Sequence, residues 1–154
     1  VDEAMGQAQT WTDMYKIFLD DYLDSYAPIM RAIVASPPGA VVIHCHAGKD
    51  RTGVVAALLL SLAGVKEQAI AADYALSQEN LWPLYEQMVA EAGGEENISR
   101  WWKPDTVPET MLATLAHLND QYGGAETYLL DAGLTAMEIE HLKRAMQPVQ
   151  KLQW

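Results

Sequence analysis

The sequence is poor in cysteine, in basic residues and in long apolar runs. Cys45 is the single cysteine, so no disulfide can form within the chain and the fold must depend on its core. Ten Lys and Arg stand against 21 Asp and Glu, giving a formal charge of −11, which argues against a broad nucleic-acid surface. The longest apolar run, residues 54–63, is far shorter than the roughly 20 residues that span a bilayer. We therefore expect no transmembrane segment and only a local anion site.

The composition is otherwise that of a globular protein. Half of the 154 residues are hydrophobic and 20% are charged, which suits one domain with one core. The single thiol favours a reducing compartment, so we expect a cytoplasmic location, although export stays open.

Most of the chain has helical periodicity. Apolar residues recur at helical spacing in seven segments, which predicts helices at 11–34, 52–63, 66–76, 81–92, 108–122, 125–131 and 136–146. Pro28 is expected to kink the first helix or to start a second one. Thr106 and Thr135 are each followed by Glu three residues later, so each predicts a capping box. Residues 93–105 have the least regular pattern.

One segment has the character of a strand. Residues 40–45 form a short β-branched apolar run after the turn residues 36–39, which predicts a buried parallel strand. A single strand cannot satisfy its own backbone groups. We therefore expect an α/β fold with a parallel sheet flanked by helices, to which this chain gives one central strand. The other strands are expected from a missing N-terminal segment of the same protein or from a separate chain, and a start at Val1 instead of Met agrees.

Residues 44–53, His-Cys-His-Ala-Gly-Lys-Asp-Arg-Thr-Gly, contain the most informative motif. Cys45 and Arg51 are separated by five residues between the end of the predicted strand and the start of a helix. Such a loop can curl so that its amides and the helix dipole face an anion, and Arg51 can hold two phosphate oxygens as a planar fork. The predicted phosphate-binding residues are His46, Ala47, Gly48, Lys49, Asp50, Arg51 and Thr52.

The same surroundings would activate the thiol. A free thiol has a pKa near 8.5, which can fall to about 3.5–7.5 at a helix N-terminus or beside cations. Cys45 would attack phosphorus, and Asp50 would protonate the leaving oxygen and then activate water. Thr52 would hydrogen-bond the sulfur. For Asp50 the alternative is a structural carboxylate, and for Lys49 the alternatives are a substrate contact and a solvated charge. This chemistry needs no metal and no cofactor.

Other readings of the motif are weaker. A zinc site lacks a second cysteine and suitable histidine spacing, and Gly48-Lys49 fails the nucleotide-binding loop pattern. A rhodanese-like enzyme would use the thiol on sulfur, with Arg51 only steering anions. A catalytically inactive phosphate-binding module is the main alternative to a phosphatase.

The motif resembles the bacterial tyrosine/serine phosphatase family of the protein tyrosine phosphatase superfamily. Further similar segments cover most of the chain, at residues 72–77, 108–111, 122–124 and 133–135. The resemblance implies activity on phosphotyrosine, with phosphoserine, phosphothreonine or phosphoinositides as further substrates of dual-specificity members. It places the nucleophile, the phosphate-binding arginine and the in-loop acid on Cys45, Arg51 and Asp50.

The resemblance also bears on the extent of the domain. The N-terminal strands of that family have no counterpart here, so residues 1–154 are expected to be the C-terminal catalytic portion of one phosphatase domain. Some members carry a helical lid, for which residues 81–103, with Trp82, Trp101 and Trp102, are the candidate. Packing in the core is the alternative for these tryptophans.

Overall fold

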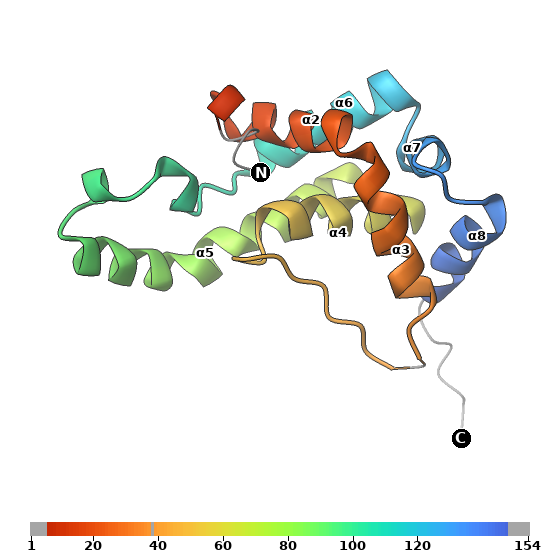
Figure 1. Cartoon of the computed structure of the whole chain (residues 1–154), viewed down its shortest axis with the longest axis horizontal. Helices are drawn as coiled ribbons and strands as arrows, with labels where there is room; N and C mark the ends of the chain where they lie inside the picture. The colour runs from red at the N-terminus through yellow and green to blue at the C-terminus, as the bar shows by residue number, and fades with distance from the viewer. Residues whose placement is uncertain (1–5, 38, 148–154) are drawn as a thin grey trace.

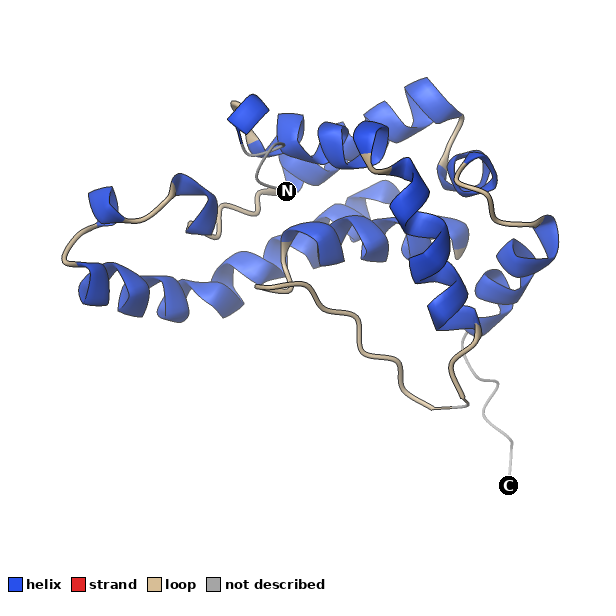
Figure 2. Cartoon of the chain, viewed as in Figure 1, coloured by secondary structure: helices blue, strands red, loops and turns tan. Residues whose placement is uncertain are grey.

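The computed structural model describes residues 6–37 and 39–147, and its regular secondary structure there is entirely helical (Figure 2). In chain order the elements are α2 (Trp11–Asp21), η1 (Leu23–Ser25), α3 (Tyr26–Val34), α4 (Asp50–Leu62), α5 (Glu67–Ala92), η2 (Glu95–Asn97), η3 (Arg100–Trp102), α6 (Pro108–Tyr122), α7 (Ala125–Asp131) and α8 (Ala136–Ala145).

Helix α4 lies at the centre of the helical body, with α2, α5, α7 and α8 in contact with it (Figure 1). Its apolar residues are not confined to one stripe, as expected for a helix covered on several sides. Six of them are buried: Val54, Val55, Ala57, Leu58, Leu59 and Leu62. Residues 45–49, here named the Cys45 loop, lead directly into α4. The packing of α4 therefore anchors the C-terminal end of that loop in the core.

The predicted parallel sheet is wrong for this chain, since no strand occurs in residues 6–37 and 39–147. Residues 40–45 run irregularly along the lower edge of the view in Figure 1. The side chain of Val42 is 83% exposed and that of Val41 is 44% exposed. The apolar β-branched pattern is present, but a strand also needs a neighbouring backbone to bond to, and none pairs with this segment in the described part of the chain.

The predicted helices agree with the structure in most places. The helices at 108–122 and 125–131 are confirmed, and α4 and α8 differ from their predictions by one or two residues at their ends. The first predicted helix is divided between α2 and α3, and Pro28 lies in the first turn of α3, where its missing N–H costs no helical hydrogen bond. The helices predicted at 66–76 and 81–92 are one continuous helix, α5, which contains Pro83.

Of the two predicted capping boxes, only one forms. The Thr135 side chain accepts a hydrogen bond from the Glu138 amide, and the Glu138 carboxylate accepts one from the Thr135 amide. The hydroxyl of Thr106 instead donates to the carbonyl of Ala75 on α5, so a tertiary contact replaces the cap.

The C-terminal part of α5 and residues 93–103 after it form an arm that extends from the helical body (Figure 1). Glycine ends α5, since Gly93 has the left-handed φ of 77° typical of a helix C-cap. The chain then returns through η2 and η3 toward the Cys45 loop. Among the described residues, no helix has both the length and the apolar character needed to cross a bilayer.

Candidate active site

The Cys45 loop ends at the N-terminus of α4, which brings backbone amides close to the thiol. Gly48 has a φ of +69°, which side-chain-bearing residues rarely adopt, and it allows the tight turn before the helix. The amides of Gly48, Lys49 and Thr52 all act on the Cys45 sulfur. The loop therefore has the form of an anion-binding nest, as the motif predicts.

The Cys45 thiol is more acidic than an ordinary cysteine. Partial burial raises its pKa, but hydrogen bonding from the Thr52 side chain and from the loop amides outweighs burial and lowers the pKa from 9.0 to about 7. The buried Thr52 hydroxyl has no hydrogen-bond partner that meets strict geometric criteria in the described part of the chain, so its proton is available to the nearby sulfur. A large fraction of the thiol is therefore ionised near neutral pH.

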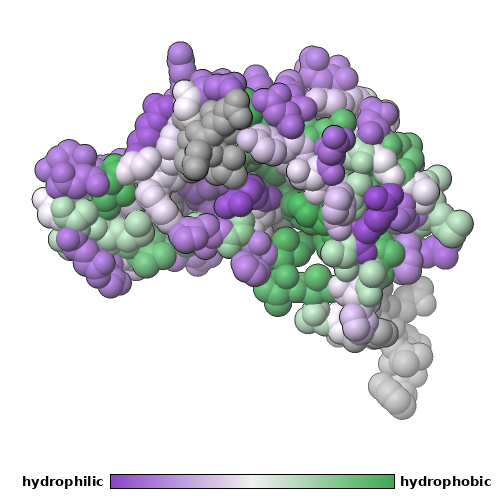
Figure 3. Space-filling model, viewed as in Figure 1, coloured by the Kyte–Doolittle hydropathy of each residue, from purple (hydrophilic) through white to green (hydrophobic). Residues whose placement is uncertain are grey.

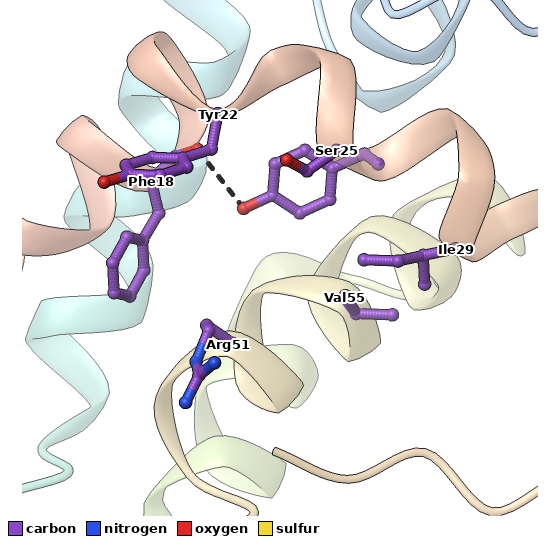
Figure 4. Close-up of a pocket in the computed structure, with 7 residues that line it drawn as sticks. Phe18, Tyr22, Ser25, Ile29, Arg51 and Val55 are labelled. Atoms are coloured by element: carbon purple, nitrogen blue, oxygen red, sulfur yellow. Dashed lines mark hydrogen bonds between the residues drawn. The ribbon is translucent and has the colours of Figure 1, made fainter. Parts of the chain in front are cut away.

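Arg51 follows on the first turn of α4 and has an exposed side chain. Figure 4 shows it beneath Phe18, with its guanidinium pointing away from the apolar side chains of Ile29 and Val55. It lines both an apolar cavity of about 280 Å³ and the cavity that contains Cys45. Because the Arg51 side chain is exposed at this cavity, its guanidinium can turn toward an anion at the thiol.

Asp50 lies between the loop and the core. Its Oδ1 accepts a hydrogen bond of 2.7 Å from the Tyr15 hydroxyl, and the Lys49 Nζ lies 3.5 Å away. Burial raises the pKa of this carboxyl, although Lys49, Tyr15 and Arg51 oppose the rise. A raised pKa increases the protonated fraction, which is the form that a general acid requires.

Lys49 is buried, with 2% of its surface exposed, and its ammonium group is turned toward the arm. Nζ donates to the carbonyl of Lys103 at 3.0 Å and to that of Trp101 at 3.4 Å, and it lies 3.6 Å from the centre of the Trp11 ring. Burial lowers the pKa of this ammonium, while the charge of Asp50 opposes the change. The Lys49 side chain thus connects the loop to the arm, while the backbone amide of Lys49 faces the Cys45 sulfur.

A cavity of about 360 Å³ opens above the thiol. The loop supplies the polar side of this cavity, whereas α2 and the arm supply its apolar and aromatic wall. The His46 ring packs edge-on against Trp102 at a centroid distance of 5.0 Å. The lining residues are Met14, Phe18, Cys45, His46, Ala47, Lys49, Asp50, Arg51, Ser99, Trp101 and Trp102.

The structure thus gathers the predicted site residues around one cavity. Cys45, Asp50 and Arg51 all line it, while Thr52 lies behind the sulfur and the Gly48 amide faces it. Trp101 and Trp102 also line it, but Trp82 lies elsewhere on the arm, where its ring Nε1 donates to Glu86. That residues 81–103 act as a lid stays a prediction.

Sequence reasoning missed Tyr15 and Tyr74, which lie directly behind Asp50. The Tyr15 hydroxyl contacts both the carboxylate and the Tyr74 hydroxyl, each at 2.7 Å. Tyr15 fits the apolar face of its helix, so its periodicity indicated only packing. Tyr74 belongs to a segment that resembles the phosphatase family, and this was the one available signal.

Comparisons with known proteins identify the family of this chain. The model of the tyrosine phosphatase family matches residues 1–147. A tyrosine-protein phosphatase of Nostoc commune is 36% identical over 92% of this chain and 48% of its own length. The triple specificity protein phosphatase PtpB of Mycobacterium tuberculosis is 30% identical over 67% of this chain and 42% of its own length.

A putative tyrosine-protein phosphatase of Cupriavidus necator is 29% identical over 78% of this chain and 44% of its own length. The chain therefore spans about half the length of the curated relatives it matches. Taken with the cysteine, the arginine and the amide nest around one cavity, these matches show that the chain belongs to the tyrosine phosphatase family.

Proposed function

We propose that this chain is the catalytic portion of a cysteine-dependent phosphatase that hydrolyses phosphomonoesters through a phosphocysteine intermediate. The observation that carries the proposal is the Cys45 thiol, whose pKa is lowered to about 7 in an amide nest, in the cavity that Arg51 also lines. A thiolate with a guanidinium at the same cavity and with inward-facing amides is suited to an anionic electrophile such as a phosphoryl group.

In the first step the Cys45 sulfur attacks phosphorus, and an S–P bond forms as the bond to the leaving oxygen breaks. The Asp50 carboxyl gives its proton to that oxygen, which leaves as an alcohol or phenol. Arg51 and the loop amides stabilise the charge that spreads over the equatorial phosphate oxygens.

In the second step the Asp50 carboxylate takes a proton from a water molecule that attacks phosphorus. The S–P bond breaks, phosphate leaves and the Cys45 thiolate is restored, with the Thr52 hydroxyl donating to the departing sulfur. Asp50 is protonated again, so the protons balance over the two steps.

The aromatic wall of the cavity favours an aryl phosphate, and we propose phosphotyrosine in a protein as the principal substrate. Trp101, Trp102 and Phe18 could pack against its ring while the loop holds the phosphoryl group. The Mycobacterium tuberculosis relative is described as having triple specificity. On that basis phosphoserine, phosphothreonine and phosphoinositides are proposed as further substrates. A reducing compartment such as the cytoplasm would protect the single thiol from oxidation.

We also propose that further polypeptide of the same protein covers the exposed residues Val41 and Val42. Figure 3 shows hydrophobic side chains gathered in the lower middle part of the face seen in that view. The curated relatives are about twice as long as this chain. Hydrogen exchange of residues 40–45, compared between this chain and the longer protein, tests the proposal. Equal exchange in the two proteins would contradict it.

Hydrolysis of p-nitrophenyl phosphate with EDTA present tests the catalytic proposal. We expect Cys45→Ser to abolish turnover and Arg51→Lys to reduce it by about 10²–10³-fold, the loss typical of removing one transition-state donor. Thr114→Val is a matched control, because Thr114 is buried and bonds only within α6. Full activity of Cys45→Ser would contradict the proposal. Binding of a phosphopeptide by the parent without turnover would instead favour the catalytically inactive phosphate-binding module.

A further inference from the structure

The side of Asp50 that faces the core is held by two buried tyrosines from different helices. Tyr15 lies on α2 and is fully buried, and Tyr74 lies on α5 and is 5% exposed. Their ring centroids are 5.9 Å apart with the rings nearly perpendicular. Since α2 and α5 are far apart in sequence, only the packing of both helices against α4 brings the Tyr15 hydroxyl to this carboxylate and the Tyr74 hydroxyl to Tyr15.

The three groups form a directed chain of hydrogen bonds. Tyr15 has one hydroxyl proton, which it donates to Asp50 Oδ1 at 2.7 Å. The Tyr74 hydroxyl lies 2.7 Å from the Tyr15 oxygen and must therefore be the donor in that pair. The proton order thus runs from Tyr74 to Tyr15 to Asp50.

Both close donors around the carboxylate contact the same oxygen. Tyr15 and the Lys49 ammonium, which is 3.5 Å away, both approach Oδ1. An oxygen that accepts a hydrogen bond and faces an ammonium group is the poorer site for a proton, so protonation is directed to Oδ2. Asp50 also lines the Cys45 cavity, so Oδ2 is the carboxyl oxygen left to exchange a proton there.

We propose that Tyr15, supported by Tyr74, is a positioning residue that holds Asp50 Oδ1 and leaves Oδ2 to carry the proton of the reaction. This inference rests on the proposed function insofar as Asp50 acts as the general acid and base. Tyr15 does not itself line the Cys45 cavity, but its hydroxyl contacts Asp50, which does, so we expect its effect on the reaction to pass through that carboxyl group.

Gly53 makes the approach of Tyr74 possible. A Cβ atom at position 53 would lie 3.2 Å from Cδ2 of the Tyr74 ring, closer than ordinary van der Waals contact. The motif glycine on the first turn of α4 therefore has a structural role beyond the loop, since it admits the ring that supports Tyr15.

Charged and titratable groups face Asp50 from the loop, from α2 and from α5, and each can affect its pKa. They are Lys49 and Arg51 beside it in the loop and first turn, Tyr15 on α2, Tyr74 on α5, and the Cys45 thiol across the cavity. Loss of the Tyr15 donor removes a hydrogen bond to the ionised carboxylate. The pKa of Asp50 should therefore rise further in Tyr15→Phe.

The experiment compares the parent with Tyr15→Phe, Tyr74→Phe and Tyr128→Phe. Tyr128 is the matched control, because it is fully buried and its hydroxyl donates to the Leu19 carbonyl, away from the loop. Titration of the Asp50 side-chain carbon by NMR should show a higher pKa in Tyr15→Phe, a smaller rise in Tyr74→Phe and no change in Tyr128→Phe.

Kinetics supply the second measurement. For phenyl phosphate, a poor leaving group, kcat of Tyr15→Phe should fall by about tenfold, a part of the roughly 10²–10⁴-fold that general acid catalysis supplies. For p-nitrophenyl phosphate, a good leaving group, the loss should be smaller. The limb of the pH–rate profile that disappears in Asp50→Asn should move to higher pH in Tyr15→Phe.

The outcomes separate this inference from the proposed function. An unchanged Asp50 titration in folded Tyr15→Phe would overturn the role of Tyr15, whether or not the chain turns over substrate. Equal losses on the two substrates, or an equal loss in Tyr128→Phe, would also overturn it. Absence of turnover in the parent would count against the proposed function alone.

Discussion

The acidity of the Cys45 thiol can be tested by removing one hydrogen-bond donor, with Thr52→Val. The thiol pKa is lowered from 9.0 to about 7. At pH 7 about one half of the thiol is then ionised, compared with about one part in a hundred for a thiol of pKa 9.

The size of the Thr52 effect follows from the strength of one such bond. A hydrogen bond to a charged group contributes about 1.5–3 kcal/mol, and one pKa unit corresponds to about 1.4 kcal/mol. Valine keeps the shape of threonine but cannot donate, so the thiol pKa should rise by about one unit or more. The ionised fraction at pH 7 should then fall by about fivefold or more.

Alkylation by iodoacetamide, followed by mass spectrometry over a range of pH, measures this fraction. Cys45 is the only cysteine in the sequence, so every alkylated thiol reports on this site. We expect a midpoint near pH 7 for the parent and a clearly higher midpoint for Thr52→Val. Thr114→Val, which loses a buried hydroxyl within α6, should behave like the parent. A parent midpoint near 9, or the same midpoint in Thr52→Val, would refute the reasoning.

Three further substitutions test the surroundings of the site and the packing of the fold. Lys49→Met should raise hydrogen exchange of residues 99–103 by about tenfold, because hydrogen bonds from a charged donor contribute roughly 1.5 kcal/mol. Unchanged exchange would show that the Lys49 side chain does not stabilise the arm. Gly53→Val should destabilise the fold by about 1–3 kcal/mol in urea unfolding, since its side chain would press on Tyr74, and parental stability would show that this contact is loose. Thr135→Ala should lower the unfolding free energy by about 1 kcal/mol through loss of the cap of α8, whereas no loss would mean that the capping box is not stabilising.

The sequence was enough to predict the family and to single out the loop residues that line one side of the cavity. Five residues between Cys45 and Arg51, with a glycine before a helix start, constrain a loop locally, so their meaning does not depend on distant contacts. Helical periodicity likewise predicted α6 and α7 within their observed bounds. It could not predict that α5 continues through Pro83, because a proline within a helix is tolerated only when surrounding contacts compensate for the lost bond.

The sheet is the clearest failure of sequence reasoning here. Val41, Val42 and Ile43 carry a strand pattern, but a strand forms only against another backbone, and pairing is a property of two segments. Lys49 is a second case, since its sequence allowed a solvated charge or a substrate contact. Instead, two carbonyls of the arm and the Trp11 ring on α2 surround its buried ammonium.

What the sequence determined by itself is therefore the local chemistry: a thiol, an arginine and a carboxyl at fixed spacing on a loop that ends in a helix. Tertiary structure alone decided how that chemistry is supported. The Tyr15 hydroxyl reaches Asp50, and the Tyr74 hydroxyl reaches Tyr15, only because α2 and α5 pack against α4. No local pattern records which side chains will meet across helices that are distant in sequence.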